Sequence, residues 1–315
     1  MQVHHGIQHL PAFKHAVLTT GMFDGVHVAH QRLLQKINNR AKEQESESVL
    51  ITFWPHPQMV LGSNDRSPIQ LLNTLEEKIA NLEKTGLDHL VILPFDTAFA
   101  SMSAEDYVEK FLVANFHPHT IVIGFNHRFG NQRKGDVHLL QEMGMKHDFT
   151  VMEFDQQVEE TISVSSTNVR KAVAEGNMEE ANLLLSQAYS IQGKVVKGQQ
   201  LGRTIQFPTA NIQLPTKEKL IPKIGVYCVS IEVNKVVHIG MMNIGTRPTV
   251  EGQHLTLEVH ILNFSEDIYE QEVQVFFHQR LRDEVKFNSI EALKAQLALD
   301  KTSTENYFKQ YNVSA

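Results

Sequence analysis

The chain has little cysteine and no long apolar segment. Cys228 is the one cysteine in 315 residues, which excludes an internal disulfide framework and a cysteine-rich zinc site. No stretch approaches the roughly 18 apolar residues of a membrane-spanning helix, and residues 1–15 lack the apolar core of a signal peptide. We therefore expect a cytoplasmic protein that does not enter a membrane, with Cys228 as a small buried hydrophobe in a strand.

The chain also has fewer positively charged than negatively charged residues. Asp and Glu outnumber Lys and Arg by 36 to 29, and the formal net charge is −7. This balance argues against a general attraction to nucleic acid or to an anionic membrane, although a local basic pocket for phosphates is compatible with it. The hydrophobic content of 42% is that of an ordinary globular protein. Since a single core stops growing at about 250–300 residues, 315 residues predict two domains.

The first half of the chain alternates short β-rich runs with segments of helical spacing. Strands are predicted at 16–20, 49–53, 90–93 and 120–123, with helices near 33–41, 74–86 and 103–113. Thr74 and Glu77 form a capping box for the second helix, which closes at Gly86. Strands that alternate with helices predict a parallel sheet covered on both faces, with a ligand crevice at the carboxyl ends of its strands.

The second half has closely spaced strands instead. After a helical region at 165–186, broken at Gly176, strands are predicted at 189–196, 226–233, 236–242, 255–261 and 273–277. Turn residues separate them, which is typical of a compact barrel or sandwich. A final helix is expected to begin after Asn288 as its cap and to pack on the strands through Ile290, Leu293 and Leu297.

A glycine-containing turn leads from the first predicted strand directly into a helix. Gly21 and Gly25 lie in this turn, and His27 and His30 follow it. Backbone N–H groups at such a helix N-terminus favour an anion, and two imidazoles three residues apart on one face could stabilise charge on a phosphate. A metal pair is the alternative, but no third ligand lies nearby, and chance pairs are expected among 17 histidines.

A second candidate site combines a glycine-rich loop with a strand carboxylate. Gly198 and Gly202 permit a loop whose amides face phosphates, and Thr209 and Asn211 supply neutral oxygens suited to Mg²⁺ and nucleotide phosphate. Ordinary turn formation is the alternative for this loop. Residues 255–261 alternate in polarity, which places Glu258 on the polar face of a strand, where a solvated carboxylate would be the default interpretation. No Walker A pattern occurs, so kinase chemistry would need a different phosphate cradle.

Taken together, these segments resemble the nucleotidyltransferase superfamily and, more specifically, the bacterial bifunctional riboflavin kinase/FMN adenylyltransferases. The matching residues lie within 21–30, 52–57, 124–136, 165–170, 193–211, 240–248, 264–269 and 281–287, and Glu258 matches as well. The resemblance implies an α/β fold, with a Rossmann-like nucleotidyltransferase domain over 1–185. A small antiparallel β-barrel riboflavin kinase domain with a C-terminal helix would follow over 186–315.

In the first domain, the resemblance implies attack of the FMN phosphate on the α-phosphorus of ATP, with pyrophosphate leaving. The implied catalytic residues are His27, His30 and Arg170. The implied ATP- and phosphate-binding residues are Gly21, Phe23, Asp24, Gly25, Ser165, Ser166 and Thr167. The implied flavin-binding residues are His56, Pro57, Asn126, Arg128 and Phe129. Helix capping is the alternative for Ser166 and Thr167. The family usually has Gly at position 29 and often Asp at 126, so Ala29 and Asn126 bear on nucleotide affinity.

In the second domain, the resemblance makes Glu258 the base that takes the proton of the terminal ribityl hydroxyl. It implies ATP and phosphate binding by Gly198, Gly202, Arg203, Thr209 and Asn211, the last two also holding Mg²⁺. Arg282 would contact flavin, with a surface salt bridge as its alternative. The expected ligands are riboflavin, FMN, FAD and ATP, and the sequence does not specify an oligomeric state. The competing interpretations are a single-activity riboflavin kinase and a flavin-binding module without turnover.

Overall fold

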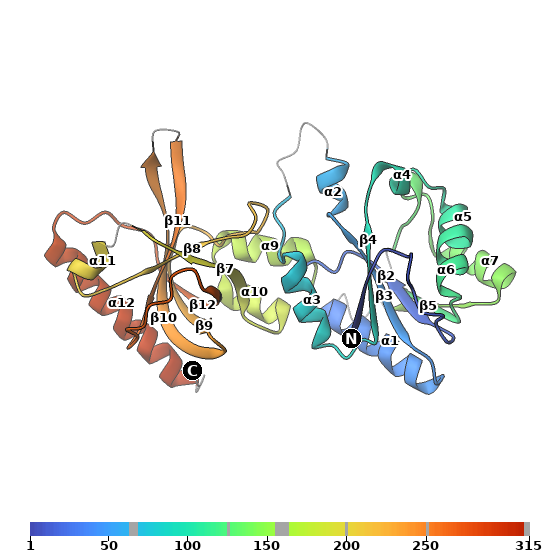
Figure 1. Cartoon of the computed structure of the whole chain (residues 1–315), viewed down its shortest axis with the longest axis horizontal. Coiled ribbons are helices and arrows are strands. Elements are labelled where there is room, and N and C mark those ends of the chain that lie inside the picture. The colour runs from blue at the N-terminus through green and yellow to red at the C-terminus, as the bar shows by residue number, and fades with distance from the viewer. Residues whose placement is uncertain (63–68, 125–126, 155–163, 199–200, 250–251, 312–315) are drawn as a thin grey trace. The chain divides into compact units, whose positions relative to one another are not determined.

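The computed structural model describes residues 1–62, 69–124, 127–154, 164–198, 201–249 and 252–311 (Figure 1). The chain divides into two compact units, Met1–Ser165 and Ser166–Ala315, and each is described on its own. Two helices that the sequence assigned to the first domain, α9 (Ser166–Glu175) and α10 (Met178–Leu185), are grouped by their contacts with the second unit.

The first unit contains a parallel six-stranded sheet in the order β1-β4-β3-β2-β5-β6. Its strands are β1 (Gln2–His5), β2 (Val17–Thr20), β3 (Ser48–Trp54), β4 (His89–Pro94), β5 (Thr120–Gly124) and β6 (Thr150–Phe154). The predicted parallel sheet is confirmed. The sequence missed β1 and β6, which lie at the two edges and are too exposed to form buried apolar runs. Because the strand order reverses at β2, a crevice is expected at the carboxyl ends of β2 and β5.

Helices and helical turns connect these strands. They are α1 (Val28–Glu43), α2 (Pro57–Val60), α3 (Leu75–Glu83), α4 (Thr97–Ala100), α5 (Ala104–Asp106), the π-helical η1 (Tyr107–Val113), α6 (Ala114–Phe116), the 3₁₀ turn η2 (Asn131–Arg133) and α7 (Val137–His147). The predicted capping box of α3 is confirmed. The Thr74 hydroxyl accepts from the Glu77 N–H at 3.2 Å, and the Glu77 carboxylate accepts from the Thr74 N–H at 3.0 Å.

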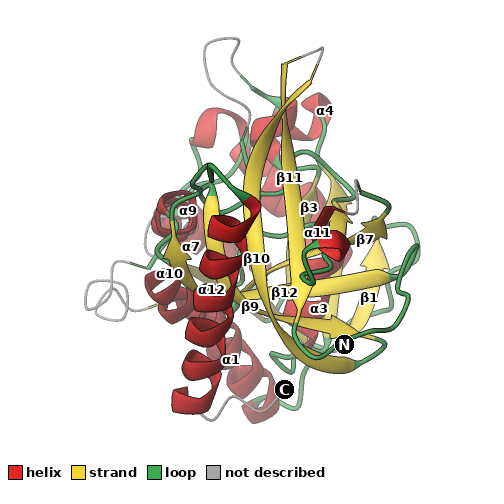
Figure 2. Cartoon of the chain, turned by 90° about the vertical axis from the view of Figure 1, so that its left-hand side faces the viewer, coloured by secondary structure: helices red, strands yellow, loops and turns green. Residues whose placement is uncertain are grey.

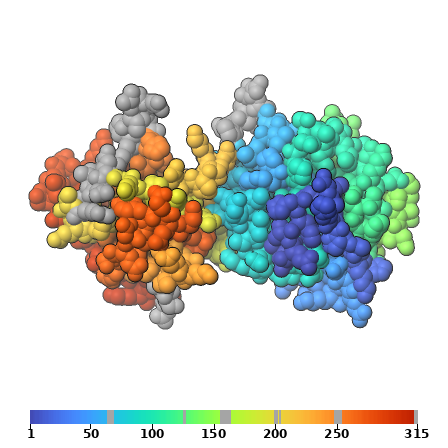
Figure 3. Space-filling model, viewed as in Figure 1, coloured from blue at the N-terminus to red at the C-terminus, as the bar shows by residue number. Residues whose placement is uncertain are grey.

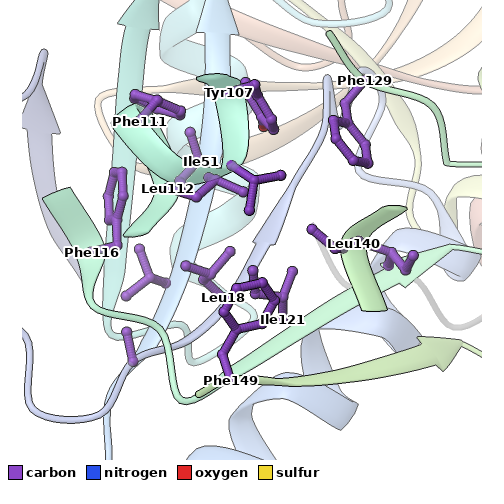
Figure 4. Close-up of a cluster of buried hydrophobic side chains, with 14 of the residues drawn as sticks. Leu18, Ile51, Tyr107, Phe111, Leu112, Phe116, Ile121, Phe129, Leu140 and Phe149 are labelled. Carbon is purple, nitrogen blue, oxygen red and sulfur yellow. The ribbon is translucent and has the colours of Figure 1, made fainter. Parts of the chain in front are cut away.

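Apolar side chains cover both faces of this sheet. On one face, Leu18 of β2 belongs to a buried cluster with Phe111 and Phe116 (Figure 4). Val17, the preceding residue of β2, belongs instead to the cluster that contains Leu34 of α1. Successive strand residues point to opposite faces, so the two clusters place helices on both sides of the sheet, as the sequence pattern predicted.

The second unit is a closed barrel in the order β10-β11-β8-β7-β12-β9 (Figures 1 and 2). Its strands are β7 (Tyr189–Val196), β8 (Ala210–Gln213), β9 (Gly225–Val233), β10 (Val236–Thr249), β11 (Gly252–Ile261) and β12 (Glu272–Arg282). All its pairings are antiparallel, so the barrel prediction is confirmed over the sandwich. The sequence missed β8, which has only four residues.

Helices α9, α10, α11 (Leu201–Thr204) and α12 (Ile290–Tyr311) complete the second unit. The prediction for the start of α12 was wrong in its cap. The Ser289 hydroxyl, not Asn288, accepts from the Ala292 N–H at 3.1 Å. The predicted apolar face was also wrong at Ile290, which is 59% exposed, because the buried residues of α12 are Asp300, Thr304 and Phe308 in its second half.

Cys228 lies buried in β9, where burial raises the pKa of its thiol to about 12, as expected for an inert strand residue. Within the described residues, no helix is both long and apolar enough to cross a membrane. Much of the segment before β2, dark blue in Figure 3, lies on the surface of the first unit, whereas Phe13 and Ala16 are buried in the core.

Candidate active sites

The turn between β2 and α1, residues 21–26, has an unusual backbone. Phe23, Gly25 and Val26 have φ angles of 48°, 86° and 42°. Positive φ is strained for a β-branched residue such as Val26, and strain of this kind is concentrated at functional sites. Asp24 of this turn is 2% exposed, and its carboxylate ties the turn to a neighbouring segment by accepting from the N–H groups of Leu72 and Asn73 at 3.1 and 3.2 Å.

His27 and His30 lie together at the N-terminus of α1. His27 is the N-cap residue, and its Nδ1 accepts from the His30 N–H at 3.4 Å. The two rings stack with centroids 3.6 Å apart, and Phe23 stacks on His30 at 4.4 Å. Burial holds the pKa of His30 well below its usual value, and the nearby charges of His27 and Lys78 lower it further. His30 is therefore neutral near pH 7. Its Nδ1 is buried without a hydrogen-bond partner among the described residues.

The sequence interpretation missed Lys78, a buried lysine of α3 beside this turn. Lys78 is 1% exposed, and its Nζ donates to the Met22 carbonyl at 2.9 Å. Burial lowers its pKa to about 8, with Asp24 acting in the opposite direction. A signal was present in the sequence, because Lys78 stands four residues before Leu82 and so shares the apolar face of α3.

A third imidazole, that of His127, lies at the carboxyl ends of β2 and β5. His127 Nε2 lies 3.4 Å from the Thr20 hydroxyl, and burial, together with Arg133, lowers the pKa of His127 to about 4. Phe129 is 7% exposed and packs against Tyr107 in the core cluster, with ring centroids 5.3 Å apart (Figure 4). His127 lies in the segment 124–136 that carries the family resemblance, but the sequence interpretation did not name it as a site residue.

The other residues predicted for the first site are spread over several elements. Arg128 forms an exposed ion pair with Asp136 at 3.0 Å. His56 caps α2 by accepting from the Gln58 N–H at 3.2 Å, and Pro57 is the first residue of that helix. Asn126 lies outside the described residues. Ser165 ends the first unit, whereas Ser166, Thr167 and Arg170 lie in the first turns of α9 in the second unit, so their place in this site stays a prediction.

In the second unit, three polar residues lie in one row across three strands. Asn211 of β8 pairs with Glu258 of β11, and Glu258 pairs with Asn243 of β10. Directly paired residues project on the same face. Leu257 and Val259 are buried, so this row faces outward, as the alternation of 255–261 predicted. Asn243 was missed as a site residue, because its place beside Glu258 depends on strand register.

The glycine-rich loop packs against this row. The Thr209 hydroxyl donates to Glu258 Oε2 at 3.3 Å. Gly198 leaves room for Asn211, because a Cβ at position 198 would lie 2.2 Å from the Asn211 amide nitrogen. A Cβ at Gly202 would lie 2.2 Å from the Phe207 carbonyl oxygen. A side chain at 202 would therefore clash with backbone, whereas one at 198 would displace the Asn211 amide. The side chain of Arg203 lies outside the described part of the chain.

His260, two residues after Glu258, fixes the segment that precedes Thr209. Its Nδ1 lies 2.8 Å from the Pro208 carbonyl oxygen, and its ring lies 5.1 Å from that of Phe207. Burial, partly opposed by the Pro208 contact, lowers the pKa of His260. The neutral ring can donate from Nδ1 to the carbonyl, which anchors the backbone beside Thr209.

Arg282 is engaged within the protein. Its guanidinium makes a bidentate ion pair with Asp300 of α12, with contacts of 2.7 to 3.1 Å, and Asp300 is 3% exposed. The salt bridge that the sequence offered as the alternative role of Arg282 is therefore present, but it is largely buried and does not lie on the surface. The predicted contact of Arg282 with flavin stays a prediction.

The hydroxyl oxygen of Thr209 and the amide oxygen of Asn211, beside the Glu258 carboxylate, fit a hard divalent cation. Hydroxyl, amide and carboxylate oxygens are the ligand types that Mg²⁺ prefers, and Mg²⁺ commonly takes its other ligands from water and substrate phosphates. Elsewhere within the described ranges, no group of three or more His, Cys, Asp or Glu side chains could hold a metal ion. The fit is therefore to a cation shared with a nucleotide, not to an all-protein cage.

Comparisons with known proteins match a different family model to each half of the chain. The FAD synthetase family model matches residues 10–168, and the riboflavin kinase family model matches residues 185–308. Bifunctional riboflavin kinase/FMN adenylyltransferases from Listeria monocytogenes and Escherichia coli K12 are 39% and 37% identical to the chain. In both cases the match covers 93% of this chain and 92% of the relative.

A solved structure described as a macrolide-efflux protein from Streptococcus pneumoniae has a similar fold. It matches with a TM-score of 0.84 and 31% identity, over 92% of this chain and 94% of that one. The chain therefore belongs to the bifunctional riboflavin kinase/FMN adenylyltransferases, with an FAD synthetase in its first half and a riboflavin kinase in its second.

Proposed function

We propose that riboflavin phosphorylation takes place on the outward face of β8, β11 and β10, with Glu258 as the general base. The row Asn211–Glu258–Asn243, with Thr209 at 3.3 Å from Glu258, supports this assignment. The Glu258 carboxylate would take the proton of the terminal ribityl hydroxyl as that oxygen attacks the γ-phosphorus of ATP. Amides of the loop at Gly198 and Gly202, with Arg203, would bind the ATP phosphates.

The matched pair Glu258→Gln and Glu232→Gln tests this base. Glu232 is a partly exposed glutamate of β9 in the same barrel and pairs with Val237 and Gln274, outside the proposed site. We expect Glu258→Gln to lower FMN production by about 10²–10⁴-fold, the usual contribution of a general base. The Glu258→Gln variant should still convert added FMN to FAD, which would show that the protein is folded. Undiminished FMN production by Glu258→Gln would refute the assignment.

We propose that the metal ion of the kinase site is Mg²⁺ and that Thr209 and Asn211 hold it together with the ATP phosphates. Bound Mg²⁺ would neutralise phosphate charge during transfer. Thr209→Ala and Asn211→Ala should each raise the Mg²⁺ concentration at half-maximal FMN production. Titration of each variant with Mg²⁺ at fixed riboflavin and ATP measures this, and unchanged titration curves would contradict the assignment.

We propose that FMN adenylylation takes place at the carboxyl ends of β2 and β5. The strained 21–26 turn and the stacked His27–His30 pair at the start of α1 support this site. The turn residues Gly21, Phe23, Asp24 and Gly25 would surround the ATP phosphates, Asp24 by shaping the backbone. His27 and His30 would stabilise charge as the FMN phosphate attacks the α-phosphorus.

The flavin and the leaving group need further residues in this proposal. The residues proposed to contact FMN are His56, Pro57, Asn126, Arg128 and Phe129, and Arg282 is proposed to contact the flavin of the kinase site. Ser165, Ser166, Thr167 and Arg170 would bind the departing pyrophosphate.

A histidine pair of variants tests the adenylylation site. His30→Gln is compared with His138→Gln, an exposed histidine of α7 in the same unit. Pyrophosphate release from ATP and FMN should fall at least tenfold in His30→Gln, because one donor to transition-state charge is removed. It should be unchanged in His138→Gln. Equal rates in the two variants would place the site elsewhere.

We further propose a functional boundary after residue 185, a cytoplasmic location and no binding of nucleic acid. The riboflavin kinase model begins at residue 185, which supports the boundary. ATP as the shared substrate supports the location, and the net charge of −7 argues against nucleic acid. Riboflavin kinase activity of residues 186–315 expressed alone, compared with that of residues 166–315, would test the boundary.

A further inference from the structure

We propose that Lys78 is a positioning residue of the adenylylation site, which fixes the Met22 carbonyl and thereby sets the shape of the 21–26 turn. The inference rests on the proposed function of that turn in binding ATP phosphates. Lys78 itself need not touch the nucleotide, because its effect would pass through the backbone to which it is bonded.

Two side chains from different elements converge on one carbonyl oxygen. Met22 O accepts from Lys78 Nζ of α3 at 2.9 Å and from the Thr52 hydroxyl of β3 at 3.2 Å. Thr52 is completely buried and Lys78 is 1% exposed, so neither bond competes with bulk water. A carbonyl has two lone pairs, and these donors occupy both of them. The Met22 carbonyl is therefore held in one direction from inside the unit.

The direction of this carbonyl decides where the next N–H points. The peptide unit is planar and trans, so the Phe23 N–H points opposite to the Met22 C=O. With the carbonyl turned toward Lys78 and Thr52, that N–H points away from the interior, as a phosphate-binding turn requires. The same peptide leads into Phe23, whose ring stacks on His30 at 4.4 Å. Lys78 thus controls both a backbone donor and the support of a catalytic imidazole.

Burial of the Lys78 ammonium costs free energy, and a hydrogen bond to a carbonyl does not by itself require a charged donor, so we infer that its charge has a further role. Asp24 acts on Lys78 as a nearby opposite charge, but its carboxylate also accepts from the N–H groups of Leu72 and Asn73. The ammonium also lies 5.6 Å from the centre of the Trp54 ring. On the side of α1, the facing titratable group is His30, whose protonation Lys78 disfavours. The Lys78 ammonium thus places a positive charge next to the turn that is proposed to bind phosphate.

The full-length enzyme allows a test with an internal control. Lys78→Met keeps the length of the side chain and removes its charge and its bond to Met22, and Thr52→Val removes the other bond isosterically. Lys84→Met, an exposed lysine just after α3, is the matched control. Adenylylation of FMN is measured with varied ATP and varied FMN, and riboflavin kinase activity of the same samples reports whether the second unit is intact.

We expect Lys78→Met to raise the KM for ATP in adenylylation about tenfold, as for the loss of a charged hydrogen bond. The KM for FMN, the kinase rate and the Lys84→Met variant should stay unchanged. Thr52→Val should shift the KM for ATP in the same direction, and the double variant should show less than the product of the two effects, because both donors hold the same oxygen. If Lys78 only stabilised the fold, its replacement would not raise the KM for ATP while leaving the KM for FMN unchanged.

The outcomes distinguish this inference from the proposed function beneath it. If His30→Gln lowers adenylylation and Lys78→Met leaves the KM for ATP unchanged, the role of Lys78 is refuted while the site stands. If His30→Gln also has no effect, the site itself is misplaced. If Lys78→Met does not fold, Thr52→Val carries the test, and an unchanged KM for ATP in that variant refutes the role of the Met22 carbonyl.

Discussion

Replacement of Lys78 by methionine should make the first unit more stable near neutral pH, even though it impairs adenylylation. Burial lowers the pKa of Lys78 to about 8, from 10.5 in an unfolded chain. Below about pH 8 the folded unit must carry a buried ammonium that the unfolded chain keeps in water. Between about pH 8 and 10.5 the unfolded chain binds more protons than the folded one, so the free energy of unfolding rises with pH over that window.

The size of the effect follows from the two pKa values. Their difference corresponds to about 3 kcal/mol of destabilisation at low pH, at 1.36 kcal/mol per pKa unit. The hydrogen bond from Lys78 to Met22 returns about 1 kcal/mol of stability. Lys78→Met should therefore raise the free energy of unfolding by about 2 kcal/mol near pH 7. By about pH 9.5 most of the folded-state titration is complete, and the linkage relation makes this advantage fall by about 2 kcal/mol.

The single tryptophan of the chain provides the assay. Trp54 ends β3 in the first unit, and its fluorescence during urea unfolding reports that unit alone. Wild type and Lys78→Met are compared between about pH 7 and 9.5, where the slope and midpoint of each transition give the free energy. Tyr107, whose pKa burial raises to about 12, titrates above this window and is present in both proteins.

A stability difference that does not change with pH would refute the reasoning, because it would mean that Lys78 has an ordinary pKa in the folded unit. A variant less stable than wild type at every pH would show that the contacts of the ammonium outweigh its burial. The Lys84→Met control should show no pH-dependent difference, since Lys84 is exposed.

Three further predictions concern single positions in the two sites. Ala29→Gly should lower the KM for ATP in FMN adenylylation by removing a buried Cβ near the start of α1, at a stability cost of about 1 kcal/mol; steady-state kinetics and Trp54 fluorescence measure the two effects. Gly198→Ala should lower riboflavin kinase activity about tenfold with little change in stability, because the new Cβ displaces the flexible Asn211 amide. Asp300→Ala should destabilise the barrel by about 3–5 kcal/mol, since it leaves the largely buried Arg282 guanidinium without its partner, and thermal unfolding measures this.

Each of these predictions has an outcome that contradicts it. An unchanged or higher KM for ATP in Ala29→Gly would show that the alanine does not crowd the nucleotide. Full kinase activity in Gly198→Ala would mean that the position of Asn211 is not critical. If Asp300→Ala unfolds at the wild-type temperature, the ion pair with Arg282 contributes nothing to the barrel.

Local signals in the sequence determined the classes of structure and both candidate loops. The capping box of Thr74 and Glu77 involves atoms within one helical turn, so residue types alone indicate it. The polar face of 255–261 follows from the two-residue period of a strand, which requires no knowledge of its neighbours. The turn at 21–26 and the loop at 198–211 were recognisable for the same reason, because their glycines and polar residues are contiguous in the chain.

Only the tertiary structure decided which side chains act together. Lys78 meets Met22, and the Asp24 carboxylate meets the backbone of Leu72, across more than forty residues of intervening chain, and no local pattern encodes such a meeting. The Asn211–Glu258–Asn243 row likewise depends on the register of three strands, which closure of the barrel fixes. The sequence alone therefore determined which segments could carry chemistry, whereas long-range packing decided the burial, the partners and hence the protonation of the groups within them.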